Sequence, residues 1–151
     1  MNFSGVLGVI LALSAAAAHA QPMPATFNLI CTGNEIFMEQ GDGLFPKMQP
    51  AKPFTTTYRI DLKAKRLCVD DCNSTVPIVD VTDTTITFEK SAFEEGGVDY
   101  VSRVNRESGK YQSVRRFGLG KGLTWGKGAV STVRDGMCEA APFSGFPRPK
   151  F

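Results

Sequence analysis

Short runs in which apolar and polar residues alternate are the feature that most constrains the fold of this chain. In the segment 57–62, Tyr58, Ile60 and Leu62 share one face, and polar or charged residues lie between them. A period of two is typical of a β-strand with one buried face, because successive side chains of a strand point to opposite sides. No segment keeps the 3.6-residue apolar period of an amphipathic helix. The pattern therefore predicts an all-β protein.

The alternating pattern recurs along the chain and is interrupted by turn residues. A first strand starts at Phe27 and is expected to end at Gly33. The Pro- and Gly-rich segment 41–53 predicts a long loop, and the capping-box spacing in 91–94 predicts a single helical turn. Short strands bounded by turns are typical of an antiparallel meander, so we expect a small antiparallel β-barrel or a sandwich. Further strands are predicted at 66–69, 76–81, 84–89, 98–105, 110–117 and 129–137.

The N-terminus reads as a secretory signal. Residues 5–18 form an uncharged, alanine-rich run that is followed by Ala18-His19-Ala20, which predicts a signal peptide cut after Ala20. The run is shorter than the roughly 20 residues that span a bilayer as a helix, so no membrane span is expected. We expect a periplasmic or secreted protein. It would comprise a signal peptide (1–20), a flexible lead-in (21–26), a β domain (27–141) and an irregular Pro-containing tail (142–151).

Export would remove the only histidine of the chain. His19 precedes the expected cleavage site, so the mature protein, beginning at Gln21, would contain none. Ser-His-Asp and Cys-His nucleophile systems, histidine general bases and histidine-ligated zinc are then excluded. Catalysis by carboxylates, lysine or tyrosine stays possible, but no catalytic motif is visible. We expect neither a cofactor nor enzymatic activity.

Four cysteines fit an oxidising compartment and allow three disulfide pairings. Cys68 and Cys72 flank a tight turn, where two α-carbons can lie within disulfide range. That pairing would leave Cys31 to pair with Cys138 and tie the first strand to the end of the domain. The alternative is a four-thiolate metal site, but two close cysteine pairs are lacking and no metal is expected.

Charge is distributed unevenly. Residues 21–97 hold 7 basic and 11 acidic residues, whereas residues 98–151 hold 10 basic and 4 acidic ones. Basic side chains beside aromatic ones can bind an anionic or acidic envelope partner, such as a phosphate, an anionic glycan or an acidic protein cleft. Alternatively, they form a solvated face that pairs with the acidic half. Nucleic acid is not expected, because little reaches the periplasm. The candidate binding residues from this pattern are Lys110, Tyr111, Arg115, Arg116, Trp125 and Lys127.

Part of the basic segment resembles a known family. Ser-Gly-Lys-Tyr at 108–111, Trp-Gly-Lys-Gly at 125–128 and Cys138 resemble the C-terminal half of periplasmic inhibitors of C-type lysozyme, which are small exported eight-stranded barrels. The resemblance implies that Ser108, with Lys110 or Lys127, would reach into the lysozyme cleft, and that an early cysteine pairs with a late one. The loop here is one residue shorter than that of the family. The chain's ending also resembles small uncharacterised exported bacterial proteins.

The sequence as a whole predicts an exported, disulfide-stapled β domain that acts by binding. Two alternatives stay open. One is a lysozyme inhibitor of the kind described above, and the other is a glycan-acting enzyme that uses paired carboxylates. The sequence does not select a carboxylate pair among its 15 acidic residues.

Overall fold

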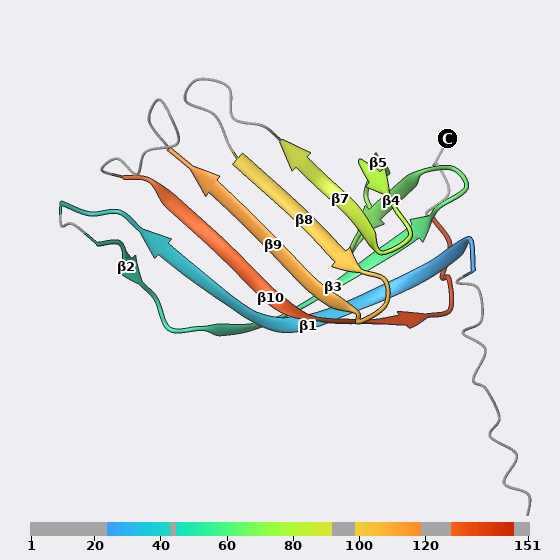
Figure 1. The fold of residues 1–151 in the computed structure, drawn as a ribbon, viewed down its shortest axis with the longest axis horizontal. Helices are drawn as coiled ribbons and strands as arrows, with labels where there is room; N and C mark the ends of the chain where they lie inside the picture. The colour runs from blue at the N-terminus through green and yellow to red at the C-terminus, as the bar shows by residue number, and fades with distance from the viewer. Residues whose placement is uncertain (1–23, 43–44, 92–98, 119–127, 147–151) are drawn as a thin grey trace, which may run out of the picture.

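The structure, a computed structural model, describes residues 24–42, 45–91, 99–118 and 128–146. Within these residues the regular secondary structure consists of β-strands. Ten strands form one antiparallel sheet that curls into a half-barrel (Figure 1). The expected all-β, antiparallel architecture is confirmed. No helix in these segments has the length and apolarity needed to cross a membrane.

The strands follow one another as an up-and-down meander. The sheet order is β5-β4-β3-β1-β10-β9-β8-β7-β6, with β2 beside β1. Chain neighbours thus lie side by side, and the pairing of β1 with β10 brings the two ends of the domain together (Figure 1). The strands are β1 (Thr26–Glu39), β2 (Lys47–Met48), β3 (Lys52–Asp61), β4 (Arg66–Val69), β5 (Val76–Pro77), β6 (Asp80–Val81), β7 (Thr85–Ser91), β8 (Asp99–Asn105), β9 (Lys110–Phe117) and β10 (Val130–Ala141).

One segment bridges the two outer edges of the sheet. The predicted strand 76–81 is divided into β5, which pairs with β4, and β6, which pairs with β7. Between them the Ile78 N–H donates to the Lys65 carbonyl at 2.9 Å and the Val79 N–H donates to the Thr87 carbonyl at 3.1 Å. The segment 76–81 passes from β4 to β7, because these two N–H groups donate to opposite edges of the sheet. The curl is closed at this end, while β3 and β7 diverge toward the other, open end (Figure 1).

The first strand does not end at Gly33. It continues to Glu39, and Gly33 lies opposite Gly136 of β10. A Cβ at Gly33 would collide with the Asp135 carbonyl, and one at Gly136 would collide with the Thr32 carbonyl. Glycine in a strand interior often marks a close approach of two backbones or a bend. Here the glycine pair lets two long strands bend together, so the residue marks curvature instead of a strand end.

The predicted loop 41–53 is also partly wrong. It contains β2, where the Gln49 N–H donates to the Phe37 carbonyl at 2.9 Å, and the start of β3 at Lys52. Pro53 lies within β3 and pairs with β1. Its missing N–H is tolerated because β4 pairs only with residues 58–61 of β3, which leaves the start of β3 at the sheet edge.

The concave side of the curl holds the core, and the faces follow the alternation in the sequence. Cys31 and Cys138 lie directly opposite in β1 and β10 and form a disulfide, with α-carbons 3.9 Å apart. Cys68 and Cys72 form the second disulfide, so the expected pairing is confirmed. Across the curl, the Tyr58 ring of β3 stacks on the Phe88 ring of β7, with centroids 4.3 Å apart. Other buried core side chains are Phe27, Leu29, Ile60, Leu67, Ile86 and Val104.

Residues 142–146, at the start of the predicted tail, form neither helix nor strand, and they pack against the sheet. Asn28 Nδ2 donates to Ser144 Oγ at 3.1 Å, and the Arg66 guanidinium lies 4.7 Å from the centroid of the Phe146 ring. The expected signal peptide, the end of the tail and nearly all of the predicted helical turn lie outside the described residues, as do Trp125 and Lys127.

Candidate functional site

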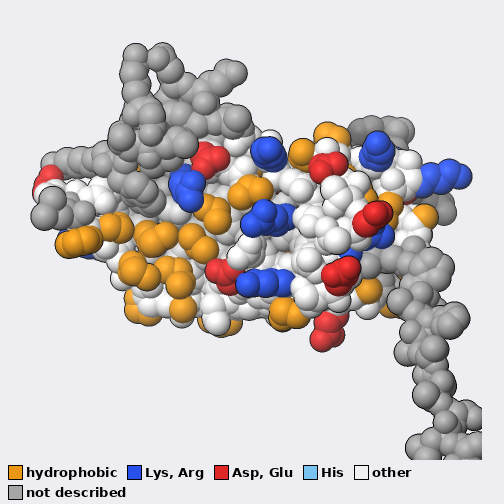
Figure 2. Space-filling model, in the orientation of Figure 1, with side chains coloured by type: hydrophobic (Ala, Val, Ile, Leu, Met, Phe, Trp, Pro, Cys, Tyr) orange, Lys and Arg blue, Asp and Glu red, His pale blue; other side chains and the backbone are white. Residues whose placement is uncertain are grey.

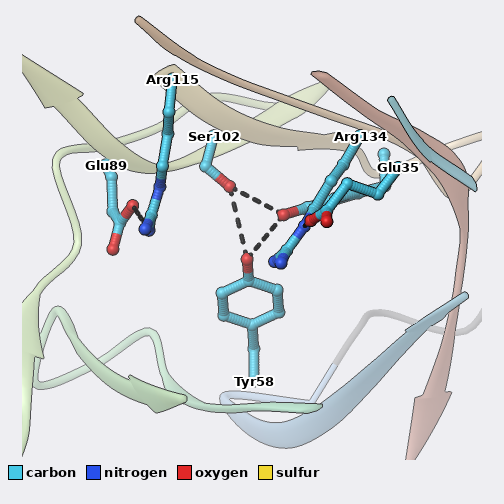
Figure 3. A network of polar contacts seen from close by, with 7 residues as sticks. Glu35, Tyr58, Glu89, Ser102, Arg115 and Arg134 are labelled. Carbon is cyan, nitrogen blue, oxygen red and sulfur yellow. Dashed lines mark hydrogen bonds and ion pairs between the residues drawn. The ribbon is translucent and has the colours of Figure 1, made fainter. Parts of the chain in front are cut away.

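Three buried hydroxyls meet where the apolar core gives way to polar side chains. They belong to Tyr58 of β3, Ser102 of β8 and Tyr111 of β9. The two phenol oxygens are 2.8 Å apart, and the Ser102 Oγ lies 3.4 Å from that of Tyr58 and 3.2 Å from that of Tyr111 (Figure 3). A hydroxyl both donates and accepts, so the three groups can satisfy one another inside the barrel. This hydroxyl triangle joins β3 to the β8–β9 hairpin.

The environment of the triangle keeps Tyr58 protonated. Burial raises the pKa of the Tyr58 phenol well above its ordinary value of 10.0, and the neighbouring Tyr111 adds to the rise. Tyr58 therefore stays neutral across the physiological range. The triangle is a structural network, and its role is to hold the concave face in place.

Two ion pairs lie beside the triangle on the same concave face (Figure 3). Arg134 Nε of β10 donates to Glu35 Oε2 of β1 at 2.5 Å, and Arg115 Nη2 of β9 donates to Glu89 Oε2 of β7 at 2.9 Å. Partial burial acts to lower the pKa of Arg134, but the hydrogen bond from Arg134 to Glu35 and the charge of Glu35 outweigh it and raise that pKa above its ordinary value. The Arg134 guanidinium also lies 5.3 Å from the centroid of the Phe54 ring.

The ion pairs border a hollow of about 240 Å³ toward the open end, which we call the arginine hollow. In the β9–β10 ladder Arg134 pairs with Ser113 and Thr132 pairs with Arg115, so all four side chains point to one face. The Arg115 side chain is 52% exposed and that of Arg134 is 35% exposed. Both arginine side chains are therefore partly exposed to solvent. The hollow is lined by Glu35, Ser113, Arg115, Phe117, Thr132 and Arg134.

The candidate residues from the sequence do not form one surface. Tyr111 is 1% exposed and belongs to the core, so it supplies no contact area on the outside of the hairpin. Arg115 lines the arginine hollow, whereas its neighbour Arg116 points to the other face and pairs with Asp99 at 2.9 Å. Lys110 is exposed, on the face opposite to Tyr111. Because successive side chains of a strand point to opposite faces, basic and aromatic residues that are close in the sequence lie on different sides of the sheet.

Ser108 is exposed but works within its own turn. Its Oγ donates to Asn105 Oδ1 at 2.9 Å and accepts from the Lys110 N–H at 3.3 Å. Asn105 Oδ1 also accepts the N–H groups of Glu107 and Ser108. Gly109 follows with a φ of 72°, and a Cβ there would lie 2.7 Å from the Cys138 carbonyl oxygen. The 105–109 turn is thus fixed from within.

The alternative to a basic binding surface, a solvated face that pairs with the acidic half, holds for some of the basic residues in 98–151. Arg115 and Arg134 pair with glutamates of the acidic half, and Arg116 pairs within its own half. On the face drawn in Figure 2, Lys and Arg side chains are interspersed with Asp and Glu side chains and form no continuous basic patch. Hydrophobic side chains gather near β2 and the adjoining end of β1, where Phe45 and Met48 are strongly exposed.

Sequence reasoning missed Glu35 and Glu89 as members of a site. A signal for Glu35 exists: if the first strand continues past Gly33, the alternation places Glu35 on the same face as Cys31. In the described segments, no three His, Cys, Asp or Glu side chains cluster as metal ligands would. No family model, curated protein or solved structure significantly matches this chain.

The raised pKa of Tyr58 predicts a loss of stability at alkaline pH. Above pH 10, tyrosine ionises in the unfolded chain, while folded Tyr58 keeps its proton. The unfolded state then binds fewer protons, and the free energy of unfolding falls as the pH rises. We expect this fall to be steeper in the wild type than in Tyr58→Phe, by up to about 1.4 kcal/mol per pH unit. Urea unfolding at a series of pH values above 10 measures it.

The matched control is Tyr100→Phe, which removes a tyrosine hydroxyl outside the triangle. Its pH dependence should follow that of the wild type. Parallel curves for the wild type and Tyr58→Phe would show that Tyr58 is not held neutral by the fold.

Proposed function

We propose that this protein is an exported binding protein whose binding site is the arginine hollow. The observation that carries the proposal is the placement of two half-exposed arginines, Arg115 and Arg134, on one concave face around an open hollow. Small-molecule sites occur preferentially in the mouths of β-barrels and combine apolar walls with a few fixed polar groups. The arginine hollow lies at the open end of the half-barrel, and its lining is mostly polar, with Phe117 as the apolar residue among those that line it.

The chemistry of the hollow favours a small ligand with an anionic group. A guanidinium has five N–H donors, and the hydrogen bonds to the glutamates engage Nε of Arg134 and Nη2 of Arg115. The remaining donors suit a carboxylate or a phosphate, which guanidinium groups bind in bidentate fashion. Ser113 and Thr132 add hydroxyls between the two arginines, and Phe117 adds an apolar wall. This agrees with the anionic partner expected from the sequence.

The same contacts favour binding over carboxylate catalysis. A glycosidase needs one carboxyl group that donates a proton and a second that acts as a base or a nucleophile. Glu35 and Glu89 each accept a hydrogen bond from an arginine, which ties both carboxylates to a positioning role. The glycan-acting enzyme therefore stays the less favoured alternative.

Ligand binding can be tested with a pair of sugars that differ in one carboxylate. We expect D-glucuronate, and inorganic phosphate, to shift the amide NMR signals around Ser113 and Thr132 in the mature protein. D-glucose should bind at least about tenfold more weakly, because it lacks the charge that pairs with arginine. If neither anion shifts these signals at millimolar concentration in the folded protein, the site assignment is wrong.

The matching variants replace whole ion pairs, so that no charge is left unpaired. Arg115→Gln with Glu89→Gln should weaken glucuronate binding at least about tenfold. The control is Arg116→Gln with Asp99→Asn, which removes an ion pair of the same 2.9 Å length on the other face and should leave binding unchanged. Equal losses in the two variants would argue against the arginine hollow.

Export is supported by the apolar run that ends at Ala20 and by the two disulfides, since disulfides persist in oxidising compartments. When the chain is expressed with its own leader, its intact mass should equal that of residues 21–151 minus four hydrogens. Reduction should restore those four hydrogens. A product that retains residues 1–20 would contradict the export proposal.

The second candidate function is inhibition of a C-type lysozyme, which is favoured by one observation. Ser108 and Lys110 are both exposed at the tip of the β8–β9 hairpin, so both are open to contact with a partner protein. The mature protein should then inhibit lysozyme at micromolar concentration, and Lys110→Ala should weaken inhibition more than Lys63→Ala, a control at another exposed turn. Absence of inhibition by the folded protein would exclude this candidate.

A further inference from the structure

A second hollow, of about 250 Å³, lies at the end of the half-barrel opposite to the arginine hollow. The 105–109 turn between β8 and β9 borders it, and this turn is at the far end of β9 from Phe117 (Figure 1). We call it the turn hollow. Its apolar walls come from both sides of the curl and are formed by Leu29, Ile86, Val104, Cys138 and Ala140.

The apolar walls leave room for a ligand because of one small residue. Four of the five wall side chains are buried members of the core. Ala140, which pairs with Leu29 across β1 and β10, is exposed, so the hollow opens to solvent beside it. A larger side chain at position 140 would extend over the hollow. The volume of about 250 Å³ suits a small ligand with a single ring or a short chain.

The mouth of the turn hollow is fixed before any ligand arrives. The Gly109 N–H donates to the Asn105 carbonyl at 2.9 Å, and the Cys138 N–H donates to the Gly109 carbonyl at 2.8 Å. These bonds attach the turn to β10 at the position of the long disulfide. A preformed site avoids the entropy loss of ordering a loop on binding.

Arg106 lines the mouth and has an unsatisfied donor. The backbone N–H of Arg106 donates to the Thr84 carbonyl at 2.8 Å. The side-chain Nη1 donates to the Thr82 carbonyl at 2.7 Å, which holds the side chain in place. Its Nε is buried and has no hydrogen-bond partner in the described part of the chain. Buried donors are usually satisfied, and an exception calls for an explanation. Since Nε is closed to solvent, a ligand acceptor in the hollow would meet the other N–H groups of this guanidinium, which has five donors in all.

We propose that the turn hollow binds a small carboxylate with an apolar body, such as an aromatic or branched aliphatic acid. The apolar body packs between Leu29 and Ile86, and the carboxylate accepts hydrogen bonds from Arg106. Glu107 also lines the hollow, but it is exposed, so solvent and salt screen its charge. This site is separate from the arginine hollow and shares no residue with it.

Benzoate and benzyl alcohol test the proposal, because they share a ring and differ in the carboxylate. Benzoate should shift the amide NMR signals of Val104, Gly109 and Ala140, and benzyl alcohol should bind at least about tenfold more weakly. Equal binding of the two would show that Arg106 does not select a carboxylate. Absence of shifts with benzoate at millimolar concentration would overturn the site itself.

Two variants act on the two halves of the site. Arg106→Gln should weaken benzoate binding at least about tenfold, with Arg103→Gln, an exposed arginine of β8, as the control. Ala140→Phe should fill the hollow and abolish binding. Because Ala140→Phe adds volume at an exposed position, it tests the site without removing the hydrogen bond from Arg106 to the Thr82 carbonyl. Benzoate binding that persists in Ala140→Phe would contradict the proposal.

The experiment is independent of the proposed function. The variant that lacks the Arg115–Glu89 ion pair should bind benzoate like the wild type, and Ala140→Phe should bind D-glucuronate like the wild type. If Ala140→Phe lost glucuronate binding as well, the two hollows would not be separate sites.

Discussion

The pairing of β1 with β10 is the constraint on which the rest of the structure depends. It extends from Asn28 opposite Ala141 to Glu39 opposite Val130, and the disulfide between Cys31 and Cys138 lies within it. Apart from β2 and the bridging segment, the remaining pairings join strands that follow one another in the chain. We call this pairing of β1 with β10 the closing pair. Without it, each of the two strands would expose an unpaired edge.

The closing pair also assembles the arginine hollow. Glu35 of β1 meets Arg134 of β10 only because the register places them opposite each other, and Arg134 in turn places Ser113 of β9 beside it. The disulfide joins residues 107 positions apart. A bridge of this span restricts the unfolded chain by about 4 to 5 kcal/mol on the loop-entropy model. Stability and site geometry thus depend on the same pair of strands.

Much of the fold follows from local patterns. The alternation predicts the buried faces at Tyr58 and Ile60 and at Ile86 and Phe88, all of which are buried. The patterns fail where a distant partner decides. Gly33 resembles a strand end in isolation, and its role as a bend depends on Gly136, about a hundred residues later in the chain.

The functional site is less predictable, because its members meet only through the register. Arg115 is marked by charge, but its partner Glu89 lies two strands away, across β8. Tyr111 shows the reverse error. Composition groups it with the basic residues, but it lies between Lys110, which is exposed, and Gln112, which is partly exposed, and its own side chain belongs to the buried face. Assigning each charged or aromatic residue to a strand face would have separated the hollow from the outer surface.

Hydrogen exchange tests the closing role of β1 and β10 most directly. In a variant with Cys31→Ala and Cys138→Ala, the free energies for opening the amides of β1 and β10 should fall more than those of β7 and β8. A variant with Cys68→Ala and Cys72→Ala should leave β1 and β10 as protected as in the wild type. A fall spread evenly over all strands, or unchanged protection of β1 and β10 without the long disulfide, would contradict this account.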